Sequence, residues 1–310
     1  MSDYRSIANL RLATRESPMA MQQAEFVKAL ILKQFPHCQI DFVPMTTLGD
    51  ECLDRPIQQI DNKSVFVKTI ESALLNNQAD FAVHCVKDMS VYPIPGLVNA
   101  ALLKRDDPRD ALLSCQGHTL ETLPQGAMVG TGSPRRIAQI KRTRPDLQFT
   151  PIRGNVNTRI KKLESGDVDA LMLSYCGLLR INKLDYITQL FDPSEFVSAV
   201  GQGTLCIQCR EGDQDIQKLL RHLHDVPTTV AIAAEQALVH RLNGDCHTPI
   251  GVYARIDEGQ LHLDACIGDD KTGAVIYTKA QGPVDNAQRI GIAAADDLIA
   301  KGANHIVSED

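Results

Sequence analysis

Long apolar segments are the first feature that this sequence lacks. None of its 310 residues falls in a run of eighteen or more uncharged, strongly apolar residues, so we predict no membrane-spanning helix. The first seventeen residues also contain no apolar segment followed by small residues, which is the pattern of a secretory signal. We therefore expect a cytoplasmic protein with no membrane partner.

An overall excess of positive charge is also missing, since the formal net charge is −6. This acidic balance argues against a nucleic-acid partner. The charge is unevenly spread, however: residues 130–162 contain nine Lys and Arg and one acidic residue, so the rest of the chain carries −14. A cationic segment in an acidic protein indicates a site for a small anionic ligand.

The cysteines do not form the paired motifs of a metal site. The nine cysteines are scattered, and Cys206-Ile-Gln-Cys209 lies in an apolar, strand-like segment without a second pair. We therefore predict free, mostly buried thiols and no metal.

What is present alternates between strand and helix patterns, and the chain is long enough for two or three domains. This βαβ rhythm predicts parallel sheets with helices on their faces. The pattern changes near residue 226, after a Gly-rich segment, Ser198–Gly203, which we expect to be a hinge. Strands are expected at 7–13, 39–45, 80–84, 127–130, 147–152, 168–173, 204–209, 250–256, 260–267 and 275–279, and helices at 17–34, 65–76, from 133, and at 155–164, 228–242 and 286–301.

Arginines occupy unfavourable positions at predicted helix starts. Ser133-Pro134 opens a helix, so Arg135 and Arg136 fall in its first turn, where the helix dipole favours Asp or Glu. Repeated local conflict of this kind indicates a function. Guanidinium groups beside unsatisfied backbone N–H groups bind carboxylates or phosphates, whereas a solvated basic face is the alternative for any single arginine.

Two other residues are candidates for chemistry. Asp88 follows a short buried strand, and ligands of open α/β sheets bind beyond the carboxyl ends of strands. A carboxylate there can stabilise a positive charge that develops on a substrate, although a loop Asp paired with Lys87 is the alternative. Cys246 follows a helix at a glycine-containing turn, where a thiol is more available than in a strand, and taken alone it is more often structural.

Together these motifs resemble the porphobilinogen deaminase family along nearly the whole chain. Each motif alone is weak, but their shared order and spacing are specific. The matching segments are Ala13-Thr-Arg-Glu-Ser-Pro18, Phe66-Val-Lys68, Ala82-Val-His84 with Lys87-Asp88, Asp107-Pro-Arg-Asp-Ala111, Gly130-Thr131 with Ser133 and Arg135-Arg136, Arg153-Gly-Asn155 with Thr158-Arg159, Ala199-Val-Gly-Gln-Gly203, and Cys246 with Pro249-Ile-Gly251.

The resemblance implies an α/β fold with two periplasmic-binding-protein-like α/β domains, an interdomain cleft and a smaller C-terminal α+β domain. We place the first domain at residues 1–103 with 204–222, the second at 104–203 and the third at 226–310. The resemblance also implies a dipyrromethane cofactor joined by a thioether to Cys246. Four porphobilinogen molecules would be condensed onto this primer with loss of ammonia, and linear hydroxymethylbilane would be released. A monomer is the family precedent.

The resemblance assigns roles residue by residue. Asp88 matches the catalytic aspartate. Residues matching cofactor-binding positions are Cys85, Lys87, Thr131, Ser133, Arg135, Arg136, Arg153, Arg159 and Cys246, and those matching substrate-binding positions are Arg15, Ser17, Lys63, Arg153, Arg180 and Gln202.

Several positions depart from the family pattern, among them Cys85 in place of a usual Ser, and Asn62, Ser64, Gly132 and Asp245. Asp245 would raise the pKa of the neighbouring Cys246 thiol. These departures leave open a catalytically weakened paralogue or a non-catalytic module that binds a tetrapyrrole or another polycarboxylate. A hydrolase that uses Cys246 and His247 is a weaker alternative, because such partners usually come from distant parts of a chain.

Overall fold

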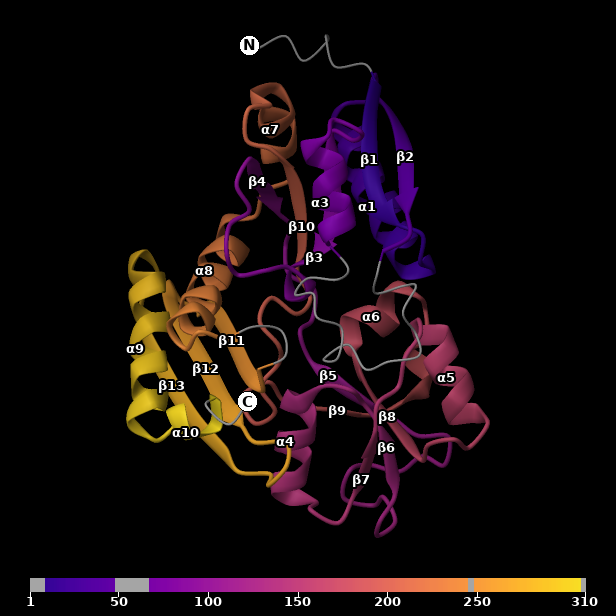
Figure 1. The fold of residues 1–310 in the computed structure, drawn as a ribbon, viewed down its shortest axis with the longest axis vertical. Coiled ribbons are helices and arrows are strands. Elements are labelled where there is room, and N and C mark those ends of the chain that lie inside the picture. The colour runs from indigo at the N-terminus through magenta and orange to yellow at the C-terminus, as the bar shows by residue number, and fades with distance from the viewer. Residues whose placement is uncertain (1–8, 48–66, 245–247, 308–310) are drawn as a thin grey trace. The chain divides into compact units, whose positions relative to one another are not determined.

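The computed structural model describes residues 9–47, 67–244 and 248–307 (Figure 1). The chain divides into two compact units. Unit 1 consists of Met1–Arg105 and Thr204–Thr228, and unit 2 of Asp106–Gly203 and Thr229–Asp310. The chain therefore crosses from one unit to the other at residues 105–106, 203–204 and 228–229.

Unit 1 contains a five-stranded mixed sheet in the order β2-β1-β3-β10-β4. Strands β1, β2 and β3 are parallel, whereas β10 runs antiparallel to both of its neighbours. Leu10 and Leu12 of β1 pack on one face with helices α1 and α7, and Ala13 packs on the other face with α3. The elements are β1 (Asn9–Arg15), α1 (Pro18–Gln34), β2 (Gln39–Met45), α3 (Lys68–Leu75), β3 (Phe81–Cys85), the 3₁₀ turn η3 (Val86–Asp88), β4 (Leu97–Leu102), β10 (Leu205–Arg210) and α7 (Gln214–Arg221).

The first sheet of unit 2 has the same arrangement, in the order β7-β6-β8-β5-β9. Strands β6, β7 and β8 are parallel, and β5 is antiparallel to β8 and β9. Helix α4 covers one face, and α5 and α6 cover the other. The elements are β5 (Asp110–Leu113), β6 (Met128–Gly130), α4 (Pro134–Thr143), β7 (Gln148–Thr150), α5 (Val156–Glu164), β8 (Ala170–Ser174), α6 (Tyr175–Arg180), η4 (Leu184–Tyr186) and β9 (Ile187–Leu190).

The rest of unit 2 is an antiparallel sheet, β11-β12-β13, with two long helices. Gly291 of α9 lies directly against the backbone of Ala234 in α8, an approach that a Cβ atom would prevent. The elements are α8 (Val226–Arg241), β11 (Ile250–Asp257), β12 (Gln260–Gly268), β13 (Val275–Pro283), η5 (Val284–Asn286), α9 (Ala287–Ala300) and α10 (Asn304–Val307). Among the described residues, no helix is long and apolar enough to cross a membrane.

This architecture confirms the predicted fold class, two α/β sheets followed by a smaller α+β part. The expectation of purely parallel sheets was wrong. In each sheet an antiparallel strand, β10 or β5, follows a crossing between the units and enters without a preceding crossover helix. The boundaries given above for three domains stay predictions.

Candidate active site

In unit 1 the candidate residues lie at the carboxyl ends of parallel strands. Arg15 ends β1, Ser17 caps α1 by accepting a hydrogen bond from the backbone N–H of Ala20, and Cys85 ends β3. Asp88 follows within η3, beside Lys87. The sheet order places β1 next to β3, so the ends of these two strands are neighbours.

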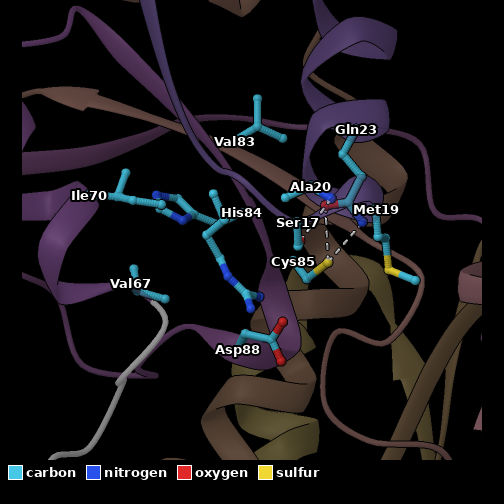
Figure 2. Close-up of a pocket in the computed structure, with 11 residues that line it drawn as sticks. Ser17, Met19, Ala20, Gln23, Val67, Ile70, Val83, His84, Cys85 and Asp88 are labelled. Carbon is cyan, nitrogen blue, oxygen red and sulfur yellow. Dashed lines mark hydrogen bonds between the residues drawn. The ribbon is translucent and has the colours of Figure 1, made fainter. Parts of the chain in front are cut away.

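These ends line a pocket in unit 1. It has a cavity volume of about 60 Å³, enough for a few water molecules, and Arg15, Ser17, Cys85 and Asp88 are among its lining residues. Figure 2 shows Asp88 below Cys85 and Gln23 above it, whereas His84 lies to the left of Cys85 in this view. The pocket therefore combines a carboxylate, a guanidinium, a hydroxyl and a thiol.

The Cys85 thiol is held by Gln23 of α1. Its Sγ lies 3.3 Å from Nε2 and 3.6 Å from Oε1 of Gln23, as the dashed lines in Figure 2 indicate. The Gln23 side chain is buried, whereas Cys85 is half-buried and faces the pocket. The Cys85 side chain is thus both held by Gln23 and accessible from the pocket.

Gln208 interacts with two buried ionisable side chains of unit 1, one of which, His84, lines the pocket. His84 of β3, Gln208 of β10 and Glu71 of α3 are all buried. Burial lowers the pKa of His84 to about 4, with Gln208 opposing the shift. Burial raises the pKa of Glu71, opposed by Gln208 and Lys68. His84 is therefore neutral at physiological pH, so it adds no positive charge to the pocket.

Unit 2 presents its candidates at the equivalent strand ends. Thr131 follows β6 and is buried, and its Oγ1 accepts a hydrogen bond from the Ser133 backbone N–H at 3.2 Å. Ser133 occupies the N-cap position of α4, but its side chain makes no capping hydrogen bond. Among the described residues the Ser133 hydroxyl therefore stays available to a ligand.

Arg135 and Arg136 follow in the first turn of α4, and both are buried against Asp110 of β5. Nη1 of Arg135 donates to Oδ2 of Asp110 at 2.7 Å and to the Val197 carbonyl at 2.7 Å. Nε and Nη2 of Arg136 donate to Oδ1 of Asp110 at 3.1 and 2.7 Å. Both arginines are thus fixed by the protein, and the basic segment is not a solvated face at this point.

The remaining candidate arginines of unit 2, which are Arg153, Arg159 and Arg180, are half-buried. Arg153 lies between β7 and α5, where Asn155 caps α5 through a hydrogen bond from the Thr158 backbone N–H. Arg159 donates from Nε to the Gly154 carbonyl at 2.9 Å. Arg180 ends α6 and forms an ion pair with Asp106 at 2.6 Å.

Gln202 belongs to the Gly-rich segment that ends at the crossing between units. Its buried side chain donates from Nε2 to Oδ1 of Asp110 at 3.0 Å and to the Pro108 carbonyl at 2.7 Å. The structure therefore brings Gln202, Arg135 and Arg136 together on one carboxylate. Lys63 and Cys246, together with Asn62, Ser64 and Asp245, lie outside the described residues.

Sequence reasoning gave no role to Asp110, Gln23 or Glu71. Asp110 was quoted as part of a motif, yet its position at the start of a buried strand, opposite a pair of arginines, needed the sheet order to be known. Gln23 carries a weak signal, because it lies on the buried face of α1 with Val27 and Ile31.

Two family models match this chain. One, described as the dipyromethane cofactor binding domain of porphobilinogen deaminase, matches residues 10–218, and the other, the C-terminal domain of porphobilinogen deaminase, matches residues 229–300. The chain belongs to the porphobilinogen deaminase family. As a porphobilinogen deaminase family member, it contains the cofactor-binding domain across both of the sheets that carry the candidate residues.

Several solved structures are similar to this porphobilinogen deaminase family chain at low identity. The periplasmic aliphatic sulphonate-binding protein of Escherichia coli has 15% identity and a TM-score of 0.40, covering 76% of this chain and 70% of that one. An arginine-specific periplasmic binding protein of Salmonella typhimurium has 11% identity and a TM-score of 0.41, covering 72% and 94%. A TRAP periplasmic solute-binding protein of Desulfovibrio salexigens has 12% identity and a TM-score of 0.43, covering 70% and 72%.

Proposed function

We propose that this protein condenses four porphobilinogen molecules head to tail on a dipyrromethane primer joined to Cys246, and releases ammonia and linear hydroxymethylbilane. One observation carries the proposal. Equivalent strand ends of the two matching sheets present a carboxylate, Asp88, and a set of cationic and hydroxyl side chains, within a chain of the porphobilinogen deaminase family. A monomeric state and a cytoplasmic location belong to the same proposal.

The side chains of unit 2 fit a ligand that carries acidic groups. Arg135 uses Nη1 for Asp110 and Val197, whereas its Nε and Nη2 have no hydrogen-bond partner among the described residues. The Ser133 hydroxyl stands unused at the N-terminus of α4, where the helix dipole favours negative charge. We assign Arg135, Arg136, Thr131, Ser133, Arg153 and Arg159 of unit 2, and Lys87 and Cys85 of unit 1, to holding the cofactor, with Cys246 as its attachment point.

When bound, the dipyrromethane supplies the nucleophilic pyrrole carbon to which the chain is extended. In the proposed reaction the carbon–nitrogen bond of the porphobilinogen aminomethyl group breaks and ammonia leaves. A carbon–carbon bond then forms between the substrate's methylene carbon and the free pyrrole carbon of the primer, and that pyrrole carbon loses its proton. Positive charge develops on the pyrrole nitrogen of the substrate during these steps.

Asp88 is the group proposed to stabilise that charge. A fixed carboxylate near the pyrrole N–H lowers the barrier because it is already in place when the charge develops. Arg15 and Ser17, on the same pocket, are proposed to bind the substrate's carboxylates, and Arg153, Arg180, Lys63 and Gln202 complete the proposed substrate set. Arg15 is suited to this role because a guanidinium binds a carboxylate through two parallel hydrogen bonds.

The test has two readouts. Purified protein is incubated with porphobilinogen, and both substrate consumption and intact protein mass are followed. We expect consumption of porphobilinogen and a protein that is heavier than its sequence by two pyrrole units. Cys246→Ser should lack this increment. Reversible binding of a tetrapyrrole without a covalent adduct or substrate consumption would refute the proposal and indicate a non-catalytic binding module.

A further inference from the structure

One buried carboxylate faces two guanidinium groups in unit 2. Asp110 is fully buried, and the side chains of Arg135 and Arg136 are 5% and 10% exposed. Burial alone would raise the pKa of Asp110, but the two arginines bring it well below its usual range. Asp110 is therefore ionised, and this group of three side chains carries a net positive charge.

An uncompensated charge among these buried side chains lowers the stability of the folded protein, because buried ions are stable only when paired and hydrogen-bonded. No carboxylate other than Asp110 is bonded to Arg135 or Arg136 within the part of the chain that the structure describes. A single anionic group would balance the surplus. The charge count thus points to one carboxylate of a ligand.

The two arginines are held to different extents. Arg136 is bonded through all three nitrogens, with Nε and Nη2 on Asp110 and Nη1 on the Met172 carbonyl at 2.9 Å. Arg135 is bonded through Nη1 alone. Its Nε and Nη2, which have no partner in the described ranges, form the side of a guanidinium that binds a carboxylate through two parallel hydrogen bonds.

We propose that Asp110 is a positioning residue that holds Arg136 and one nitrogen of Arg135, so that the other side of Arg135 binds one carboxylate of the tethered dipyrromethane. Gln202 supports Asp110 from the Gly-rich segment. Without the Asp110 carboxylate, the two guanidinium groups repel each other and lose the hydrogen-bond acceptor that they share. The side of Arg135 that binds the ligand is then displaced. This inference rests on the proposed function and adds to it the residue that prepares the cofactor site.

The test follows loading of the cofactor, not turnover. Apo protein is produced in cells that make no porphobilinogen and is then incubated with porphobilinogen, and the gain of two pyrrole units is followed by intact mass. We expect Asp110→Asn to gain this mass about 10- to 100-fold more slowly than the parent. The matched control is Asp146→Asn, which also breaks an Asp–Arg pair in unit 2, that with Arg144, and should load at the parental rate.

A second variant, Gln202→Leu, tests the inference if Asp110→Asn does not fold. Gln202→Leu keeps all three charges and removes the neutral hydrogen bonds that Gln202 donates to Asp110 and to the Pro108 carbonyl, so it should slow loading about 3- to 5-fold. Parental loading by folded Asp110→Asn, or by Gln202→Leu if Asp110→Asn does not fold, overturns the inference. A parent that gains no mass refutes the proposed function, whereas slow loading confined to the variants supports both.

Discussion

Oε2 of Glu235 accepts a hydrogen bond from the backbone N–H of Gly201 at 2.7 Å. Its other oxygen, Oε1, accepts one from the backbone N–H of Ala254 in β11 at 2.8 Å. The side chain is fully buried. A single carboxylate of α8 therefore fixes both the Gly-rich segment that carries Gln202 and the first strand of the C-terminal sheet.

Glu235→Gln should destabilise unit 2. The amide keeps the shape of the side chain but offers one acceptor oxygen, so one of the two buried backbone N–H groups loses its partner. We expect the free energy of unfolding to fall by about 1–3 kcal/mol, measured by urea denaturation. Exposed Glu121, also in unit 2, provides the control Glu121→Gln, and equal stability of the two variants would contradict the expected role.

Much of the fold followed from local patterns. The Ser17-Pro18 and Ser133-Pro134 pairs marked the starts of α1 and α4 correctly, and the strand expected at 39–45 is β2. Strands β4, β5 and β9 and helices α6 and α7 were not predicted. β5 is buried on every residue, so it shows no period-two alternation, and its partners β8 and β9 lie far along the chain.

The candidate site was predictable to a smaller extent. Sequence spacing showed that Asp88 and the arginines end strands or begin helices, but the pairing of Arg135 and Arg136 with Asp110 depends on β5 entering the sheet beside β8. Likewise, the contact between Cys85 and Gln23 joins residues that are 62 positions apart. Long-range pairings of this kind leave no periodic signal in a single sequence.

Asp88→Asn should separate turnover from cofactor loading. The amide keeps the size of the side chain and removes the charge that is proposed to stabilise the cationic substrate, so turnover should fall by about 100-fold or more. Intact mass should still show the two-pyrrole increment. Asp41→Asn, at an exposed position of β2 in the same unit, should retain parental turnover. Turnover of Asp88→Asn within a few-fold of the parent would remove Asp88 from the mechanism.

His84 should make unit 1 less stable as the pH falls. Its pKa is about 4 in the folded protein against 6.5 for an exposed histidine, because burial disfavours the charged ring. Between these values the unfolded chain takes up a proton that the folded state does not. Stability is therefore unaffected well above pH 6.5, falls as the pH drops towards 4, and changes no further below it.

The predicted size of this loss is about 2 kcal/mol between pH 7 and about pH 5. His84→Gln should lack that part of the pH dependence, as measured by unfolding at the two pH values. His37→Gln, at an exposed position of the same unit, is the control and should behave like the parent. An unchanged pH dependence in His84→Gln would show that this histidine is not the source.

Cys85 should be the thiol in the pocket that reacts with alkylating agents. Among the cysteines of the described residues only Cys115 is exposed and only Cys85 is half-buried, whereas the others are buried. Burial raises the pKa of Cys209 and of Cys266 to about 12, which makes those thiols inert. With iodoacetamide we expect labelling at Cys115 and, more slowly, at Cys85.

Peptide mapping with and without porphobilinogen checks this expectation. The substrate should slow labelling of Cys85 at least several-fold and leave Cys115 unaffected, because only Cys85 lines the pocket. Inactivation should follow the Cys85 adduct and be absent in Cys85→Ser. Equal protection of both thiols, or none at Cys85, would mean that the substrate does not occupy this pocket.

The position of β10 between β3 and β4 also means that the sheet of unit 1 is completed late in protein synthesis. Strand β4 pairs only with β10 in that sheet, and Leu205 and Ile207 complete the core beneath α1 and α7. Residues 97–102 therefore leave the ribosome about a hundred residues before their hydrogen-bonding partner does. The apolar β4 segment is therefore exposed to aggregation while the whole β7-β6-β8-β5-β9 sheet is translated. A message truncated before codon 210 yields a unit 1 in which β4 lacks its partner strand.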